Sequence, residues 1–481
     1  MRRPARDRPL LAIAYDDGAV SPGEVGVALA ELGDVVFLVP DTAHVAAMRP
    51  VLAQLGAVRD LSGDARSDAE VVRELAPDAL VTFSERLIRT TAKLARAAEL
   101  PYHSPDTALL LTDKTRQRAA LRAAGVDDVR TAPLDSLADW PAALALVGLP
   151  AVVKPVRGAG SRHTHPVHDE EEALRVLTEV FADLPPAPSG EPRLTMEEML
   201  VGRDRLPLGD YASVESLCGP EGVTHLAVSG KLPLVAPFRE PGRYWPTQLP
   251  DDERRAVLDL VTRALEALGV RHGLTHTEVK LTPEGPRLVE VNGRIGGHVN
   301  GLARTACGVD LVHAAVLQAL GRPTGLGPLR PDRVHFQHNG LAPVRPCRLV
   351  SVDGAAAVRA MAGISGYRSF VRPDERLPGG VMTRELDVLW GVADTHEEMV
   401  RVVRDALETL HYTFDFTDPQ GGTHPTGAST GLRTVAASSC GAWQDVPAPE
   451  PTCEPTCGAA RRLTPEPARG PTPEPASEGA S

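Results

Sequence analysis

Short apolar runs alternate with segments of helical period along the first hundred residues. Three runs have the length of a buried strand: LLAIAY at 10–15, DVVFLV at 34–39 and DALVTF at 78–83. Two segments between them space their apolar residues as helices do: GEVGVALAEL at 23–32 and AEVVREL at 69–75. Because strand and helix alternate, we expect a parallel α/β unit over residues 1–104.

Later segments predict helices with defined ends. In DDERRAVLDLVTRALEALG, residues 251–269, apolar side chains recur at i, i+3, i+4, i+7, i+8 and i+11 from Val257. The segment TDKTRQRAALRAAG has Thr112 or Asp113 as a candidate N-cap and Gly125 as a terminator. A mixed segment after residue 323 ends near Asp418, and its last helix is THEEMVRVVRDALETL.

A β-hairpin is predicted where THTEVKLTPEGPRLVEVNGR alternates on both sides of TPEGP. A three-residue loop at 283–285 would pair Thr282 with Pro286 and place Glu278 directly opposite Glu290. By the same register, His276 faces Asn292.

The expected hairpin carries an oxygen-rich patch, made by Glu278, Glu290 and Asn292. Residues i and i+2 of a strand lie about 7 Å apart on one face. Two directly opposed carboxylates repel each other, and a hard cation such as Mg²⁺, which takes carboxylate oxygens, would reverse that repulsion. The pattern therefore indicates either a metal site or a solvated polar face of a sheet.

Two further stretches have candidate chemistry. In PAVVKPVRGAGSRHT, a strand presents Lys154 and runs into a turn with Gly158, Gly160 and Ser161, where free backbone N–H groups and a lysine would suit phosphate. It is not a Walker-type loop, and an ordinary hairpin turn is the alternative. The stretch LTMEEMLVG at 194–202 fits a strand passing into an interdomain connection, or an edge strand.

Composition narrows the class of protein. The chain of 481 residues has a formal charge of −12 built from interspersed acids and bases, so we expect no nucleic-acid or membrane partner. The apolar run after the first arginines is too short for a signal peptide and ends at Asp16, which predicts a cytoplasmic protein. Cys218, Cys307 and Cys347 lack metal-ligand spacing and fit inert thiols.

The tail from 419 to 481 is rich in Pro, Glu, Thr, Gly and Ala, a composition typical of disorder. Cys453 and Cys457 in CEPTC suggest a metal or redox pair, but the surrounding prolines and the missing second ligand pair favour a solvated tail. Its repeats suit docking to a partner, which composition does not identify.

Taken in order, these stretches resemble the ATP-grasp superfamily of carboxylate–amine ligases. The resemblance rests on LLLTDKTRQRAALRAAGV, PAVVKPVRGAGSR, MEEMLVG, HTEVKL and RLVEVNGRIGGHVNGL, and covers roughly residues 105–322. The L-amino-acid ligase group, which makes dipeptides and related amides, is the most similar. The resemblance implies an α/β and α+β multidomain protein: a pre-ATP-grasp domain at 1–104, the ATP-grasp domain at 105–322, a small α+β C-terminal domain at 323–418 and the disordered tail at 419–481.

The resemblance also implies roles for individual residues. ATP phosphates would be held by Lys114 and Lys154, under a loop containing Gly158, Gly160 and Ser161. Adenine would lie at a hinge of Glu197, Glu198 and Leu200. Mg²⁺, or Mn²⁺ in its place, would be bound by Glu278, Glu290 and Asn292. Catalytic roles would fall to Arg294, beside the transferred phosphoryl group, and to His276, for which a structural role is the alternative.

An ADP-forming ligase is implied, which activates a carboxylate as an acyl phosphate and joins it to an amine. Biotin-dependent carboxylases share the E-x-N-x-R strand but have a glutamate near the place of Gly297 and His298, so bicarbonate chemistry is less expected. The alternatives are a ligase of non-amino-acid substrates and a degenerate ATP-binding scaffold. Homodimers are common among similar enzymes, and the sequence leaves both the oligomeric state and the two substrates open.

Overall fold

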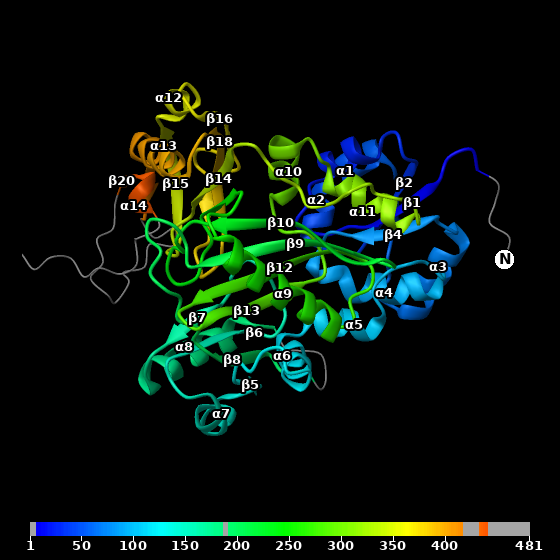
Figure 1. The fold of residues 1–481 in the computed structure, drawn as a ribbon, viewed down its shortest axis with the longest axis horizontal. Coiled ribbons are helices and arrows are strands. Elements are labelled where there is room, and N and C mark those ends of the chain that lie inside the picture. The colour runs from blue at the N-terminus through cyan, green and yellow to red at the C-terminus, as the bar shows by residue number, and fades with distance from the viewer. Residues whose placement is uncertain (1–5, 186–190, 417–431, 441–481) are drawn as a thin grey trace, which may run out of the picture. The chain divides into compact units, whose positions relative to one another are not determined.

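Residues 6–185, 191–416 and 432–440 are described in a computed structural model (Figure 1). All of them belong to one compact unit. Four sheets organise it: two of four antiparallel strands, one of four parallel strands and one of eight strands. Within these ranges no helix has the length and apolar character needed to cross a membrane.

The N-terminal region is a parallel sheet with the order β3-β2-β1-β4, as the alternating pattern predicted. Its strands are β1 (Leu10–Ala14), β2 (Asp34–Val39), β3 (Ala57–Asp60) and β4 (Ala79–Thr82). Its helices are α1 (Pro22–Leu29), α2 (Ala43–Leu55), α3 (Ala65–Leu75) and α4 (Ile88–Ala97), and the 3₁₀ turn η1 (Glu85–Leu87) follows β4. Chain segments at the carboxyl ends of parallel strands are where such sheets usually bind ligands, and η1 lies at that end of β4.

A second sheet is antiparallel, with the order β5-β8-β6-β7. It consists of β5 (Thr131–Leu134), β6 (Ala151–Pro155), β7 (His165–Val167) and β8 (Leu194–Glu198), together with α7 (Trp140–Val147) and α8 (Glu170–Asp183). Two helices, α5 (Pro105–Thr112) and α6 (Lys114–Ala123), precede it, and a short 3₁₀ turn η2 (Leu137–Asp139) leads into α7. Because β8 pairs with β5 on one side and β6 on the other, the alternative of an edge strand at 194–202 is wrong.

The eight-stranded sheet has the order β13-β12-β9-β10-β11-β14-β18-β16. Its strands are β9 (Tyr211–Gly219), β10 (Gly222–Lys231), β11 (Gly242–Trp245), β12 (Gly273–Thr282), β13 (Gly285–Asn292), β14 (Val334–Leu341), β16 (Ile364–Ser369) and β18 (Glu385–Ala393). The helix α9 (Asp251–Ala267) packs on β13 through the apolar stripe predicted from Val257 onward. Strands from both sides of the expected boundary at 322 thus share one sheet, and the domain boundaries stay a prediction.

The hairpin of β12 and β13 has a shorter loop than predicted. Thr282 pairs with Gly285, and not with Pro286, so only two residues form the turn. A β-bulge between Glu278 and Val279 then shifts the strand pairing by one residue, which brings Glu278 opposite Glu290. Glu278 therefore does lie opposite Glu290, although the predicted three-residue loop was wrong.

The C-terminal region adds a sheet with the order β17-β15-β19-β20. It contains β15 (Cys347–Asp353), β17 (Arg376–Leu377), β19 (His411–Asp415) and β20 (Leu432–Ala436), with α12 (Ala355–Arg359), α13 (His396–Thr409) and α14 (Ala437–Cys440). The structure differs here from the expectation of a tail without structure after 419, because residues 432–436 extend the sheet beside β19. The CEPTC stretch lies outside the described residues.

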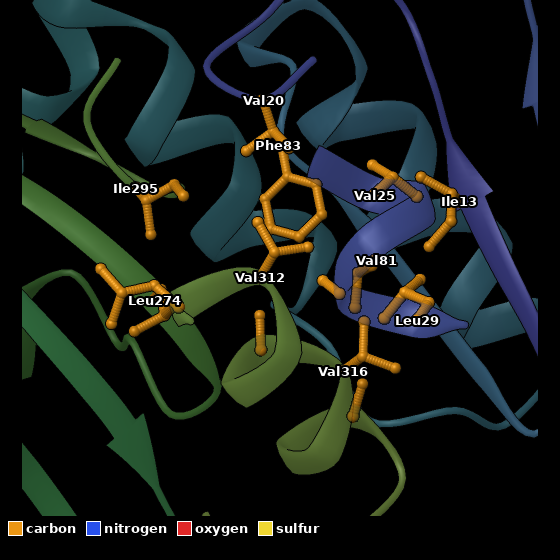
Figure 2. Close-up of a cluster of buried hydrophobic side chains, with 14 of the residues drawn as sticks. Ile13, Val20, Val25, Leu29, Val81, Phe83, Leu274, Ile295, Val312 and Val316 are labelled. Atoms are coloured by element: carbon orange, nitrogen blue, oxygen red, sulfur yellow. The ribbon is translucent and has the colours of Figure 1, made fainter. Parts of the chain in front are cut away.

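One hydrophobic core joins the N-terminal region to later parts of the chain (Figure 2). It includes Phe83 beyond β4, Ile295 beyond β13, and Val312 of α11 (Leu311–Ala319), which follows α10 (Val299–Cys307). Ile295 is fully buried. The core therefore fixes the chain immediately beside two polar residues, Glu85 and Arg294.

Candidate functional site

The structure brings the three predicted metal ligands together at one end of the β12–β13 hairpin. Glu278 and Glu290 are paired in register, and Asn292 follows two residues later on β13. Lys114 Nζ lies 2.9 Å from Glu290 Oε1. Arg294 contacts Asn292 Oδ1 at 3.4 Å. Two carboxylates and one amide thus lie among cationic side chains, partly buried at the edge of the sheet.

These donors fit a hard divalent cation. Mg²⁺ is usually bound by one or two carboxylates and completes its octahedron with waters and substrate phosphates. The described residues contain no group of three or more His, Cys, Asp and Glu side chains arranged for a metal. Two carboxylates and an amide, completed by phosphate oxygens, would make a site of a different composition.

His276 is part of the same patch and is almost fully buried. Its Nδ1 makes a short hydrogen bond with Glu215 of β9, and its Nε2 lies 3.4 Å from Glu278 Oε1. Burial lowers the pKa of His276, but the Glu215 carboxylate outweighs burial and raises the pKa above its ordinary value. The imidazole thus contacts one acid on each side, and its catalytic role stays a prediction.

The paired glycines after Arg294 explain how His276 can lie so close to the chain. A Cβ at Gly296 would lie 2.6 Å from His276 Nδ1, whereas a Cβ at Gly297 would meet nothing within 4 Å. The Gly296 N–H also donates to Glu215 Oε2 at 3.3 Å. Gly296 is therefore required by close packing against the imidazole.

Lys114 begins α6, which is capped by Asp113, one of the two N-caps expected from the sequence. Its Nζ donates to the Gly158 carbonyl at 3.0 Å as well as pairing with Glu290. Burial lowers the pKa of Lys114, but Glu290 outweighs burial and raises the pKa above its ordinary value. The lysine is thus a fixed positive charge between the glycine loop and the carboxylates.

Lys154 forms a buried ion triad with Glu197 and Arg118 of α6. Its Nζ lies 2.9 Å from Glu197 Oε2, and Arg118 approaches the same oxygen at 2.8 Å. Burial raises the pKa of Glu197, but the two cations outweigh burial and hold the pKa at about 2. Lys154 therefore lies in a site of net positive charge, which suits an anionic ligand.

The other residues predicted at the adenine hinge lie at and beyond the end of β8. Glu198 pairs with Arg130 at 2.5 Å, and the Glu198 N–H donates to the Arg130 carbonyl at 3.0 Å. Leu200 is half-buried just beyond the strand. The side chains of Glu197 and Glu198 are thus engaged with cations, so any contact to adenine would have to come from backbone groups or Leu200.

The glycine loop connects β6 to β7, which pair antiparallel, so it is also the hairpin turn that the sequence offered as the alternative. Gly158, Gly160 and Ser161 all have positive φ, at 142°, 69° and 54°. Ser161 Oγ donates to the Phe238 carbonyl at 2.7 Å, and the Thr383 N–H donates to the Gly160 carbonyl at 2.7 Å. The loop is therefore bonded to segments far away in sequence.

Arg294 meets a partner from the N-terminal region. Its Nε lies 3.3 Å from Glu85 Oε2, and its NH1 donates to the Ile295 carbonyl at 2.9 Å. Burial raises the pKa of Glu85, which Arg294 only partly opposes. The side chain of Arg294 is held on two sides before any substrate binds.

A second charged cluster on the same sheet was missed by sequence reasoning. Lys231 is fully buried, and its Nζ lies 2.9 and 3.0 Å from the two carboxylate oxygens of Glu240. Arg243 donates to Glu240 Oε1 from Nε at 3.0 Å and from NH2 at 2.6 Å. Burial raises the pKa of Glu240, but Arg243 and Lys231 outweigh it and hold the pKa far below its ordinary value. No motif marks this cluster; the only signal was a lysine ending an apolar strand.

Comparison with known proteins places this geometry in a family. Residues 147–301 match the profile of the ATP-grasp domain. Alanine–anticapsin ligase of Bacillus subtilis is 27% identical over 310 residues, 58% of this chain and 66% of that protein. Carnosine synthase 1 of Gallus gallus is 31% identical over 271 residues, 54% of this chain but only 29% of that protein. The fold is shared with an L-amino acid ligase from Bacillus licheniformis, at a TM-score of 0.68 and 23% identity, over 85% of this chain and 99% of that one.

Residues 147–301 therefore form an ATP-grasp domain, and the fold is the ATP-grasp fold with a parallel α/β region before it, as the resemblance implied. The chain is an enzyme related to carboxylate–amine ligases, and the relatives named above are two ligases and a synthase. The chain spans about two thirds of the alanine–anticapsin ligases it matches and less than a third of the carnosine synthase.

Proposed function

We propose that this protein activates a carboxylate, most simply that of an amino acid, as an acyl phosphate and joins it to an amine, releasing ADP and phosphate. The observation that carries the proposal is the convergence of Lys114 from α6, Glu290 from β13 and the glycine loop at Gly158. Cationic, carboxylate and backbone groups for a metal-bound triphosphate meet there. The names of the ligase relatives support the same chemistry.

The residues support this reaction through charge. Attack of a carboxylate on the γ-phosphate brings anions together, and Lys114, Lys154 and Arg294 offset their repulsion. Glu278, Glu290 and Asn292 would hold Mg²⁺, which neutralises phosphate charge when bound. The amine then attacks the acyl carbonyl, the new C–N bond forms as the C–O bond to phosphate breaks, and the amine proton leaves to solvent or phosphate. No covalent enzyme intermediate is required.

Closure of the glycine loop would protect the acyl phosphate from water. The bonds that Gly160 and Ser161 make to Thr383 and Phe238 are consistent with such closure. We also infer that ATP and Mg²⁺ are used, that both organic substrates are small molecules and that the enzyme acts in the cytoplasm.

The test is ATP turnover with acids and amines supplied separately and together. ADP and phosphate should form rapidly only with both, an amide should be the organic product, and hydroxylamine should trap the activated acid as a hydroxamate. Formation of AMP and pyrophosphate would contradict the proposal, because it requires attack at the α-phosphate. Absence of turnover with every acid would favour the scaffold alternative.

A further inference from the structure

Polar side chains continue across the eight-stranded sheet on the face that carries the metal carboxylates. The strand registers pair Glu278 with Ser213 and Ser213 with Ser229. Lys231, two residues after Ser229, pairs with Arg243, which in turn pairs with Gln337 of β14. Residues paired in register share a face, as do residues two apart on a strand.

Three polar atoms on the far part of this face lack partners. They are Arg243 NH1, Gln337 Oε1 and Asn339 Oδ1, which are buried without a hydrogen bond to the rest of the described chain. Their residues are 7%, 9% and 2% exposed. Native proteins rarely leave such atoms unpaired, because each loses its bonds to water on burial.

The orientation of two of these groups is fixed by their neighbours. Arg243 uses Nε and NH2 on Glu240, so NH1 is the donor left over. Asn339 Nδ2 donates to Glu385 Oε1 at 2.9 Å, which leaves its carbonyl oxygen directed elsewhere. One spare donor and one spare acceptor therefore have defined positions.

The charge of this region calls for an anion. Lys231 and Arg243 share the single carboxylate of Glu240, so the triad carries one excess positive charge in a buried place. Glu385 offsets part of this charge from a distance, but its oxygens are engaged by His298 Nε2 at 2.8 Å and by Asn339, so Arg243 NH1 has no hydrogen-bond partner among the described residues. A buried excess charge is costly unless a ligand or partner neutralises it.

Resting on the function proposed above, we propose that Arg243, Gln337 and Asn339 form the binding site of the amine substrate, and that this amine carries a carboxylate of its own. The carboxylate accepts from Arg243 NH1 and neutralises the triad. N–H or O–H groups of the same molecule donate to Asn339 Oδ1 and Gln337 Oε1. The phosphate-binding lysines, Lys114 and Lys154, belong to the other end of the site.

The first experiment compares nucleophiles in the full-length enzyme. The twenty proteinogenic amino acids and their carboxamides are supplied as amines with ATP, Mg²⁺ and the acid that gives most hydroxamate. Free amino acids should be used at least about tenfold more efficiently than their carboxamides, because a hydrogen bond to a charged group is lost in the amide. Equal use of both would overturn the proposal.

The second experiment uses variants. Arg243→Lys keeps a positive charge for Glu240 but loses the spare donor, and should raise KM for the amino acid about tenfold or more. The KM for hydroxylamine should change far less than the KM for the amino acid, since hydroxylamine has no carboxylate. Arg333→Lys is the matched control, because Arg333 is exposed near the start of β14 and pairs with Asp394.

Gln337→Met serves if Arg243→Lys does not fold, because it removes only the acceptor and leaves the ion triad intact. It too should raise KM for the amino acid while hydroxamate formation persists. An unchanged KM in a folded variant would contradict the proposal. Loss of hydroxamate formation in the wild-type enzyme would instead refute the proposed function, so the two failures are distinguishable.

Discussion

The Arg294 guanidinium lies 3.3 Å from the carboxylate of Glu85, although 208 positions of sequence separate the two residues. Phe83 and Ile295, their near neighbours in the chain, belong to the same hydrophobic core (Figure 2). The N-terminal region thus positions the side chain that we assign to the transferred phosphoryl group. Glu85 itself follows β4, at the carboxyl end of a parallel strand.

Glu85→Gln should therefore lower kcat about tenfold, since a neutral amide anchors the guanidinium less firmly than a carboxylate does. Steady-state kinetics with saturating ATP would measure it. Glu74→Gln, at an exposed position of α3 in the same region, is the control and should be neutral. A wild-type kcat in Glu85→Gln would show that Arg294 does not depend on this anchor.

Glu290→Gln should keep the fold and abolish Mg²⁺-dependent turnover, because it removes a negative oxygen ligand with little change of shape. The dependence of rate on Mg²⁺ concentration measures this. Glu284→Gln in the turn of the same hairpin is exposed and should behave as wild type. Full turnover of Glu290→Gln at low Mg²⁺ would rule out the ligand role.

Lys154→Met should weaken ATP binding strongly, because Lys154 is the lysine of the buried triad beside the glycine loop. Isothermal titration of ATP into each protein would measure the effect. Lys93→Met, exposed on α4, is the matched control. Lys231→Ala is unsuitable as a control, because loss of Lys231 leaves Glu240 short of one buried partner. Equal ATP affinities of the Lys154 and Lys93 variants would contradict the placement of the phosphates.

Stability should depend on pH through Glu197. Its pKa falls from the ordinary 4.5 to about 2 in the folded protein, so its contribution is fully present above about pH 4.5 and is lost as the pH falls toward 2. Glu197→Gln should cost about 3 kcal/mol at pH 7, because Lys154 and Arg118 lose their shared partner. Urea unfolding at pH 7, 4 and 3 should show the difference from wild type shrinking as the pH falls; a constant difference would contradict the assignment.

Two C-terminal truncations of different length should differ in their effect on stability. If the whole segment 419–481 were disordered, as its composition suggests, a chain ending near Asp418 would fold and turn over normally. Since β20 pairs with β19, removal of 419–481 should lower the melting temperature, whereas removal of 441–481 should not. Differential scanning calorimetry of the two truncated chains measures this. Equal melting temperatures would mean that β20 adds nothing to the sheet.

Local sequence patterns predicted the helices and caps that depend on neighbouring residues in the sequence. The stripe from Val257 produced α9, Asp113 caps α6 as one of the two expected N-caps, and the helix predicted in THEEMVRVVRDALETL is α13. The opposition of Glu278 and Glu290 was also predicted, but a bulge compensates for the shorter turn. A prediction from the sequence pattern does not anticipate such a bulge, because it assumes that each residue of one strand pairs with one residue of the other.

The contacts that complete the site come from residues far apart in the chain. Glu215 and His276 meet across neighbouring strands, and Glu85 reaches Arg294 from the 3₁₀ turn η1 after β4. Asn339 and Glu385 lie on strands beyond the matched family segment. No periodicity or short motif encodes these pairs; they follow from strand order, which one sequence does not reveal.

The order of the eight-stranded sheet limits how this enzyme can be re-engineered. Because β14 and β18 continue the same hydrogen-bonded ladder as β12 and β13, the strands that carry the paired carboxylates and the C-terminal strands form one continuous sheet. Exchanging residues 323–418 with those of a relative would cut the ladder between β11 and β14. Chimeras should therefore be joined in loops outside this sheet. Substrate range should change more readily through single substitutions on the polar face of the sheet than through exchange of whole segments.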